Sequence, residues 1–207
     1  MTMLERTRII SSNSTTFVAT DRATAIANAR ANSGTLATDV GRVAAQWPRL
    51  LPYANDNSGS FTKAPPSYVW GSSTTTPQLL FFAVSPSVFG LNTDNQVVLN
   101  LTVFCDNAHD VQIDLFDNTS GDLFTSLTPA GNLTDGLLDP NTGVVDDVPF
   151  NWLNVRYYSQ FSTSVPASRN GHTFQLVVSF AAVNYSISPP SFNPAALAFA
   201  IDVYLSI

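Results

Sequence analysis

The sequence predicts a mainly β protein: an antiparallel two-sheet β-sandwich, jelly-roll-like in its connections, with a short helical and extended N-terminal arm. Three observations predict this fold class. From Pro77 onward, apolar and polar residues alternate in short runs, which is the pattern of half-buried strands. Turn-favouring residues separate these runs, and no helical pattern intervenes. The chain has 207 residues, a length that suits one sandwich or barrel.

The N-terminal arm is expected over residues 1–60 and should contain one or two short helices. Residues 21–31 (DRATAIANARA) hold good helix formers behind an aspartate that is suited to cap a helix. A second helix is predicted where apolar residues repeat at helical spacing before Pro48. We interpret this stripe as a core or subunit contact. The assembly surface predicted around it comprises Leu36, Val40, Arg42, Val43, Trp47 and Arg49.

A connector follows over residues 61–76, rich in Pro, Gly, Ser and Thr. Phe61, Tyr68 and Trp70 interrupt it. Aromatic residues in an irregular segment usually pin that segment to the body of a domain. We therefore expect a strapped connector and not a free linker.

The β-sandwich itself is expected over residues 77–207, within a protein that forms a single domain. Adjacent strand residues face opposite sides, so at least one of Tyr157 and Tyr158 should point away from the core. Residues 106–110 (DNAHD) read as a turn. The long final strands suit a jelly roll better than an immunoglobulin-type sandwich. Strands are predicted near residues 78–84, 96–105, 111–117, 122–128, 151–162, 172–187 and 196–207, and a short one at 16–19 would make eight.

Charge is sparse and unevenly distributed. Charged residues make up 12% of the chain, its only lysine is Lys63, and the net charge is −6. Residues 1–63 carry seven basic and four acidic groups (+3), and the remainder carries two basic and eleven acidic groups (−9). The two parts should attract each other within one chain or between copies, although a chance distribution explains the asymmetry equally well. A direct nucleic-acid contact is disfavoured, because such sites concentrate Lys and Arg on one face.

Conventional catalytic signatures are missing from the sequence. His109 and His172 are the only histidines, and neither lies in a hydrolase or metalloprotease motif. Cys105 is the only cysteine and lies in an apolar run, so it is expected to pack as a small buried hydrophobe. We therefore predict that the protein is not an enzyme.

No cofactor is expected, and the one metal candidate is an acidic segment that resembles calcium-binding loops only in composition. The EF-hand order of ligands is absent from it, and a plain solvated loop is the alternative interpretation. The candidate calcium ligands are Asp135, Asp139, Asn141, Asp146 and Asp147.

Two functional hypotheses from different classes follow, beside a third, a hydrolase that uses the Asp-rich loops, which the missing catalytic signatures disfavour. The first is a structural subunit that assembles with copies of itself, as a viral capsid or coat protein or a surface filament subunit does. The alternative is a carbohydrate-binding or adhesive β-sandwich, in which Trp70 and Trp152 would stack on sugars and calcium could assist. The N-terminal residues do not resemble a secretory signal, and no apolar run has the length of a membrane span. We expect a soluble protein in a virion or an extracellular assembly, with no membrane contact.

Overall fold

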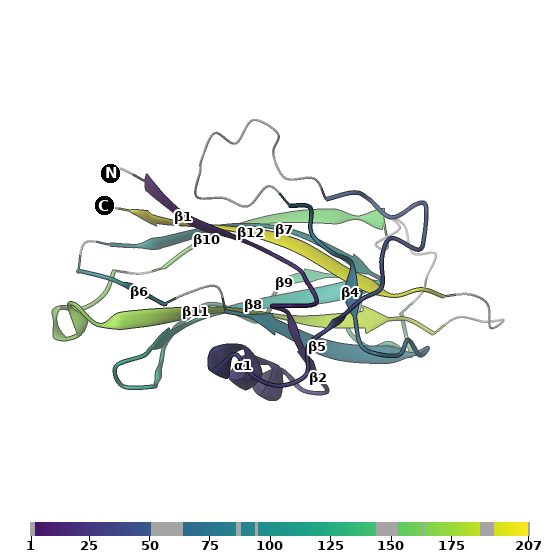
Figure 1. Ribbon diagram of the computed structural model, residues 1–207, viewed down its shortest axis with the longest axis horizontal. Coiled ribbons are helices and arrows are strands. Elements are labelled where there is room, and N and C mark those ends of the chain that lie inside the picture. The colour runs from purple at the N-terminus through teal and green to yellow at the C-terminus, as the bar shows by residue number, and fades with distance from the viewer. Residues whose placement is uncertain are drawn as a thin grey trace.

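Two six-stranded antiparallel sheets pack face to face and make up the body of the protein (Figure 1). This computed structural model describes residues 3–50, 64–85, 88–93, 95–143, 153–162, 164–186 and 193–206, with side chains from residue 7 onward. The first sheet contains β10 (Val155–Phe161), β7 (Val97–Asp106), β12 (Ala196–Ser206), β1 (Met3–Ile10), β4 (Val69–Trp70) and β3 (Thr38–Asp39). The second contains β2 (Phe17–Ala19), β5 (Gln78–Val84), β6 (Val88–Gly90), β11 (Thr173–Asn184), β8 (Ala108–Asp117) and β9 (Leu123–Asp135).

The eight longer strands have jelly-roll connectivity. One sheet places them in the order β1-β12-β7-β10 and the other in the order β5-β11-β8-β9. Numbered along the chain, these orders are 1-8-3-6 and 2-7-4-5, so most successive strands cross from one sheet to the other. Two interlocked Greek keys of this kind define a jelly roll. The predicted fold class, a jelly-roll-like β-sandwich, is confirmed.

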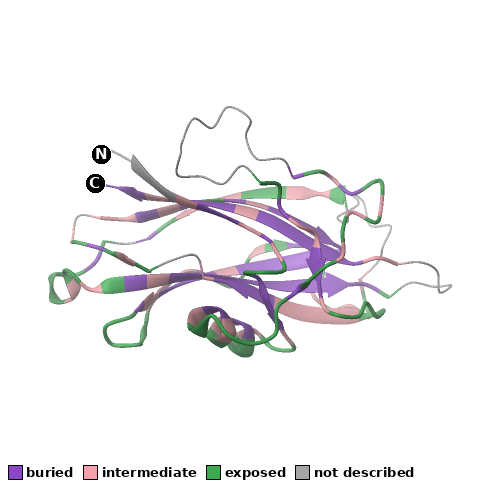
Figure 2. Ribbon diagram, in the orientation of Figure 1, coloured by how far each residue is buried: buried purple, intermediate pink, exposed green. Residues whose placement is uncertain are grey.

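The hydrophobic core lies between the two sheets. In β7 the predicted alternation holds, with Leu99, Leu101 and Val103 buried in the core and Asn100 exposed. Figure 2 shows buried segments along the central strands of both sheets. Phe180 of β11 stacks on Phe199 of β12, with ring centroids 4.5 Å apart, and so joins the two layers. Apolar side chains that face inward from both sheets are what hold the sandwich closed.

The N-terminal segment is built into the sandwich, and the predicted arm is not seen in residues 3–50. Strand β1 pairs along β12 from Met3↔Ser206 to Ile10↔Ala200, so the two ends of the chain lie together (Figure 1). Strand β2 pairs with β5 in the other sheet. Because β12 would otherwise present unpaired backbone groups on this side, pairing with β1 satisfies them.

One of the predicted N-terminal helices is present. Helix α1 (Arg22–Ala31) lies on the outer face of the second sheet (Figure 1). An Asp21 side-chain oxygen accepts a hydrogen bond from the Thr24 backbone N–H at 2.8 Å, which is the predicted N-cap. Asn32 ends the helix in the left-handed conformation.

The prediction of a second helix before Pro48 is wrong. Residues 38–39 form β3, which pairs with β4, and Gly41 adopts a positive φ of 64°, which a helix cannot contain. The apolar stripe consequently does not share a face: Trp47 is fully buried, whereas Val43 is 54% exposed. Strand pairing with a distant segment has outweighed local helical spacing. Among the described residues, no helix has the length and apolar character needed to cross a membrane.

The predicted turn over residues 106–110 is also wrong. Strand β7 ends at Asp106 in one sheet and β8 begins at Ala108 in the other, so this segment is a sharp corner between layers. His109 and Asp110 are strand residues and both are buried. The turn-forming composition of DNAHD therefore marks a change of sheet and not a surface loop.

Candidate functional site

Two exposed aromatic side chains lie on β10, at one edge of the first sheet. Its side chains alternate, so Tyr157, Ser159 and Phe161 lie on the outer face of the sheet. Tyr157 is 70% exposed and Phe161 is 71% exposed, the highest values among the large hydrophobic residues that the structure describes. Between them the Ser159 hydroxyl is hydrogen-bonded to Asn100 Oδ1 at 2.7 Å, next to β10 on β7. We call Tyr157, Ser159 and Phe161 the β10 outer row.

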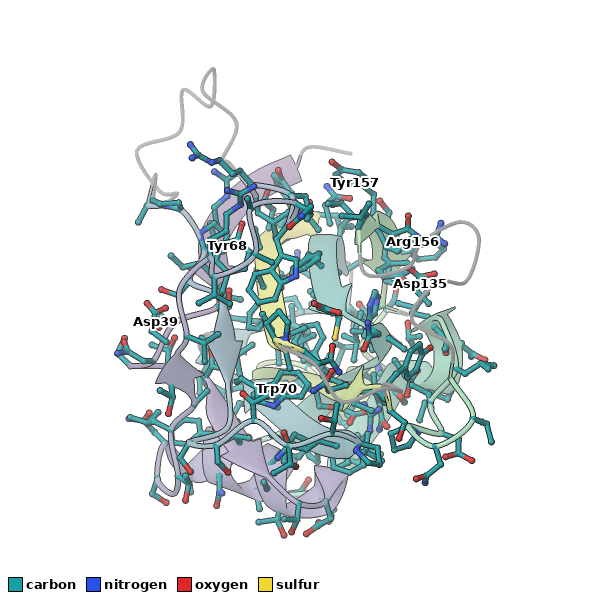
Figure 3. The ribbon with its side chains drawn as sticks, turned by 90° about the vertical axis from the view of Figure 1, so that its right-hand side faces the viewer. Asp39, Tyr68, Trp70, Asp135, Arg156 and Tyr157 are labelled. Carbon is teal, nitrogen blue, oxygen red and sulfur yellow. The ribbon has the colours of Figure 1, made fainter. Side chains whose placement is uncertain are left out.

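The inner side of β10 is fixed to the second sheet by two polar contacts. Arg156 Nη2 donates to Asp135 Oδ1 of β9 at 2.6 Å, and the hydroxyl of Tyr158 lies 3.0 Å from His109 Nε2 of β8. Figure 3 shows Asp135 and Arg156 side by side, with Tyr157 near them at the surface. Because these contacts hold the inner side chains, the outer row is presented on a fixed strand.

Burial decides the protonation of this inner cluster. Burial lowers the pKa of His109 to about 4, although the Asp135 carboxylate opposes that shift. Burial likewise raises the pKa of Tyr158 to about 12. The hydrogen bond from Arg156 to Asp135 raises the pKa of the guanidinium. At neutral pH, His109 and Tyr158 are thus both neutral.

The alternation in the sequence indicated at least one exposed tyrosine at positions 157–158, without deciding which, and it did not indicate Phe161. The expectation that at least one of Tyr157 and Tyr158 points away from the core is confirmed, since Tyr158 faces inward and Tyr157 outward. Counting in steps of two from Tyr157 reaches Phe161, and this could have predicted the second aromatic of the row.

Of the residues predicted as an assembly surface, Val40 and Val43 line one hollow and Val40 packs near Trp47, but the set does not share one exposed face, and its role in assembly stays a prediction. Leu36 is 41% exposed and Arg49 is exposed, but Arg42 is occupied locally, where it donates to the backbone carbonyls of Ala45 and Trp47. Trp47 packs in the protein's own interior, so it cannot contact a second copy from this position.

Trp47 belongs to a polar network at the corner between the sheets. Its indole N–H donates to Asp106 Oδ2 at 2.7 Å, and Asn107 Nδ2 donates to Asp106 Oδ1 at 2.6 Å. The Asn107 side-chain Oδ1 accepts from the backbone N–H of Tyr185 at 2.8 Å. Burial raises the pKa of Asp106 to about 7, and the hydrogen bond from Trp47 opposes that shift. This network ties residues 36–50 to the body of the sandwich.

A shallow hollow of about 390 Å³ lies where residues 36–50 meet the segment before β12. None of its lining side chains ionises near neutral pH. The lining residues are Val40, Val43, Thr74, Thr76, Asn193, Pro194 and Ala195.

The predicted calcium ligands have separate roles where they are described. Asp135 is paired with Arg156, and Asp139 closes a turn by accepting from the Asn141 backbone N–H at 2.9 Å, which lowers the pKa of its carboxyl. Asp146 and Asp147 lie outside the described residues. Within the described part of the chain, no group of three or more His, Cys, Asp or Glu side chains is placed to hold a metal ion.

The remaining residues of chemical interest are engaged in the fold. His172 Nδ1 lies 2.8 Å from Asp117 Oδ2, which also accepts from Arg169 at 3.0 Å. Cys105 is buried, as expected, and burial raises the pKa of its thiol, which donates to the carbonyl of Ala108. A thiol held in its protonated form is a poor nucleophile.

Comparison with known proteins does not identify a family. No family model matches the chain, and no curated protein matches it. Among the solved structures that match, one titled "CBM4 structure and function" is 10% identical, with 61% of this chain and 72% of that chain covered and a TM-score of 0.27. A likeness of this size supports no conclusion about function.

Proposed function

We propose that this protein is a structural subunit that assembles with copies of itself, and that the β10 outer row is part of the contact surface. The observation that carries the proposal is the exposure of Tyr157 and Phe161 along one strand of a sheet whose other large apolar residues are mostly buried. Burying an aromatic side chain of this size contributes about 1.5–3 kcal/mol. Two such residues per copy can form the centre of an interface.

Composition and fold support the same proposal. The chain has 12% charged residues and a single lysine, so much of its polar surface consists of hydroxyl and amide groups. Such groups cost less to desolvate than ions when two copies pack together. Jelly rolls form the shells of many viruses, although this fold also serves other functions. A capsid or coat subunit and a surface filament subunit are both forms of the proposed role.

Sedimentation velocity over a range of protein concentrations tests this proposal. We expect concentration-dependent assembly of the wild-type protein, and particles or fibres in electron micrographs. Tyr157→Ser/Phe161→Ser should weaken assembly at least about tenfold, since it removes more than about 1.4 kcal/mol of apolar burial. Val88→Ser/Leu123→Ser is the matched control, because these residues are 50% and 51% exposed on other strands. A wild-type protein that stays monomeric at millimolar concentration excludes the proposal.

Carbohydrate binding is the second candidate, and the same row favours it. Tyr157 and Phe161 lie four strand residues apart, roughly 13 Å, and Ser159 and Asn100 place polar groups between them. Such a surface can stack on sugar rings. Trp70 cannot do so, because it is fully buried and its indole donates to Gln78, and Trp152 lies outside the described residues. A glycan array with wild type and Tyr157→Ala separates this candidate from assembly.

A further inference from the structure

The edges of the two sheets differ in how they are protected from pairing with another chain. An exposed edge strand can pair with a strand of another chain, and proteins usually prevent this with short edge strands, charged residues, proline or bulges. Strands β2, β3 and β6 have three, two and three residues. Strand β9 has register shifts against β8 at three places and contains Pro129 and Gly131. Strand β1 has a register shift between Glu5 and Thr7 and carries three charged residues.

Strand β10 lacks most of these protections, and its one charged residue, Arg156, is paired with Asp135 of its own chain. It has seven residues (VRYYSQF) without proline, glycine or lysine, and it pairs with β7 in continuous register from Val155↔Phe104 to Phe161↔Val98. Within the described part of the chain, no strand pairs with its other edge. In an antiparallel sheet, alternate residues direct their N–H and C=O groups away from the neighbour. Among the residues that the structure describes, no strand bonds to those outward groups of β10, so a further strand can pair with them.

We propose that β10 pairs with β10 of a second copy, antiparallel and about a two-fold axis at Tyr158, so that two six-stranded sheets join into one. This inference rests on the proposed self-assembly and specifies its contact. A two-fold contact uses the same surface on both partners, so the strand must be complementary to itself.

The side chains of β10 meet that condition. With Tyr158 on the axis, Arg156 lies opposite the partner's Gln160, so the only charged residue of the strand does not face its own copy. Tyr157 lies opposite the partner's Ser159, and Val155 opposite the partner's Phe161. The two Tyr157 side chains are diagonal neighbours, about 7–8 Å apart, a separation that aromatic rings can bridge. The two outer rows then form one continuous apolar ridge.

Disulfide trapping between copies tests the register. Tyr157→Cys protein and Ser159→Cys protein, distinguishable by a mass tag, are mixed and mildly oxidised. Directly opposed strand residues have Cβ atoms about 4.5–5.5 Å apart, close to the separation that a disulfide needs. We expect the mixed disulfide dimer to form at least tenfold faster than from the control mixture of Ser159→Cys and Phe161→Cys. In the control the two positions are offset by four residues, roughly 13 Å. Native Cys105 is 1% exposed and should not compete.

A pair of charge variants at one position provides a second test. Gln160→Arg places like charges opposite each other twice in the dimer and should weaken assembly, while Gln160→Glu places opposite charges there and should strengthen it. Opposed charged pairs contribute about 0.2–1 kcal/mol each, so we expect changes of roughly 2- to 30-fold in the dimer dissociation constant at low salt.

The possible results separate this inference from the proposed function. Preferential trapping of the 157–159 mixture, with opposite effects of the two charge variants, supports the β10 pair. Self-association that persists without preferential trapping overturns the β10 pair and leaves the proposed function standing. A protein that remains monomeric overturns both.

Discussion

His109 shows, at the scale of one residue, how burial selects a protonation state. Its imidazole lies in β8 between the sheets, and its partner is the hydroxyl of Tyr158 on the facing β10. A charged imidazole there would lose its hydration, which is why burial lowers its pKa to about 4. The sequence predicted that this histidine lies in a turn.

This lowered pKa predicts a loss of stability in acid. The unfolded chain binds the His109 proton near pH 6.5, whereas the folded chain binds it only near pH 4. The stabilising contribution is therefore complete above pH 6.5 and is lost as pH falls toward 4, by about 3 kcal/mol. Urea unfolding at pH 7.5 and 4.5 measures it. His109→Gln should remove this part of the pH dependence and His172→Gln should retain it, so equal profiles for His109→Gln and wild type would contradict the prediction.

Asp106 should make the protein less stable as pH rises, the opposite of the effect of His109. Its unfolded pKa is 3.8 and burial raises the folded pKa to about 7, so the unfolded chain ionises first as pH rises. Stability from this group is therefore greatest below pH 3.8 and falls as pH approaches 7, by at most about 4 kcal/mol. Asp106→Asn keeps an acceptor for Trp47 and cannot ionise. Its melting temperature relative to wild type should increase between pH 5 and pH 8, and a constant difference would refute the assignment.

At the scale of elements, one buried side chain, Trp47, anchors the segment of residues 36–50 to the body of the sandwich. Trp47 is fully buried and lies 5.7 Å from Tyr68 and 5.7 Å from Phe104, measured between ring centroids. Local sequence suggested a helix here, yet the segment gains more by pairing β3 with β4 and by filling this cluster.

Removing the Trp47 ring should detach residues 36–50 from the body of the sandwich. Trp47→Ala is expected to cost about 3–5 kcal/mol in the free energy of unfolding, because it leaves a cavity and an unpaired Asp106 oxygen. Limited trypsin digestion should then cut faster at Arg42 and Arg49. Val43→Ala is the control, since that side chain is 54% exposed and its loss should change stability by less than about 0.5 kcal/mol.

At the scale of the whole molecule, the two ends of the chain close the first sheet together. Arg8 of β1 and Asp202 of β12 form a buried two-point ion pair, with Nε–Oδ1 at 2.6 Å and Nη2–Oδ2 at 2.9 Å. These residues are 194 positions apart. The sandwich is therefore complete only when its first and last strands are both present.

Replacing one partner of this ion pair should lower the free energy of unfolding more than replacing both partners. Arg8→Ala or Asp202→Ala leaves a buried charge without its main partner and should cost about 3–5 kcal/mol, whereas the double variant should cost less than the sum of the two. Chemical denaturation of all four proteins gives the coupling free energy. A coupling near zero would mean that the two side chains contribute independently.

The sequence alone determined the features that depend on near neighbours. Alternation from Pro77 onward located the strands that became β5 and β7 to β12, and Asp21 with Asn32 bounded α1. It also predicted that at least one of Tyr157 and Tyr158 faces away from the core. These predictions hold because periodicity and capping reflect interactions within a few residues.

Only the tertiary structure decided which strands pair and which aromatics remain outside. The apolar spacing from Leu36 to Trp47 is compatible with a helix, but in the structure residues 38–39 pair with β4 as a strand. The DNAHD segment is compatible with a turn, but in the structure it connects a strand of one sheet to a strand of the other. Likewise, the sequence around Trp70 allowed this side chain either to pin the connector to the body or to stack on a sugar, and only the structure shows that it is fully buried. The physical reason is that strand pairing and burial are settled by contacts between distant segments, which a local pattern does not contain.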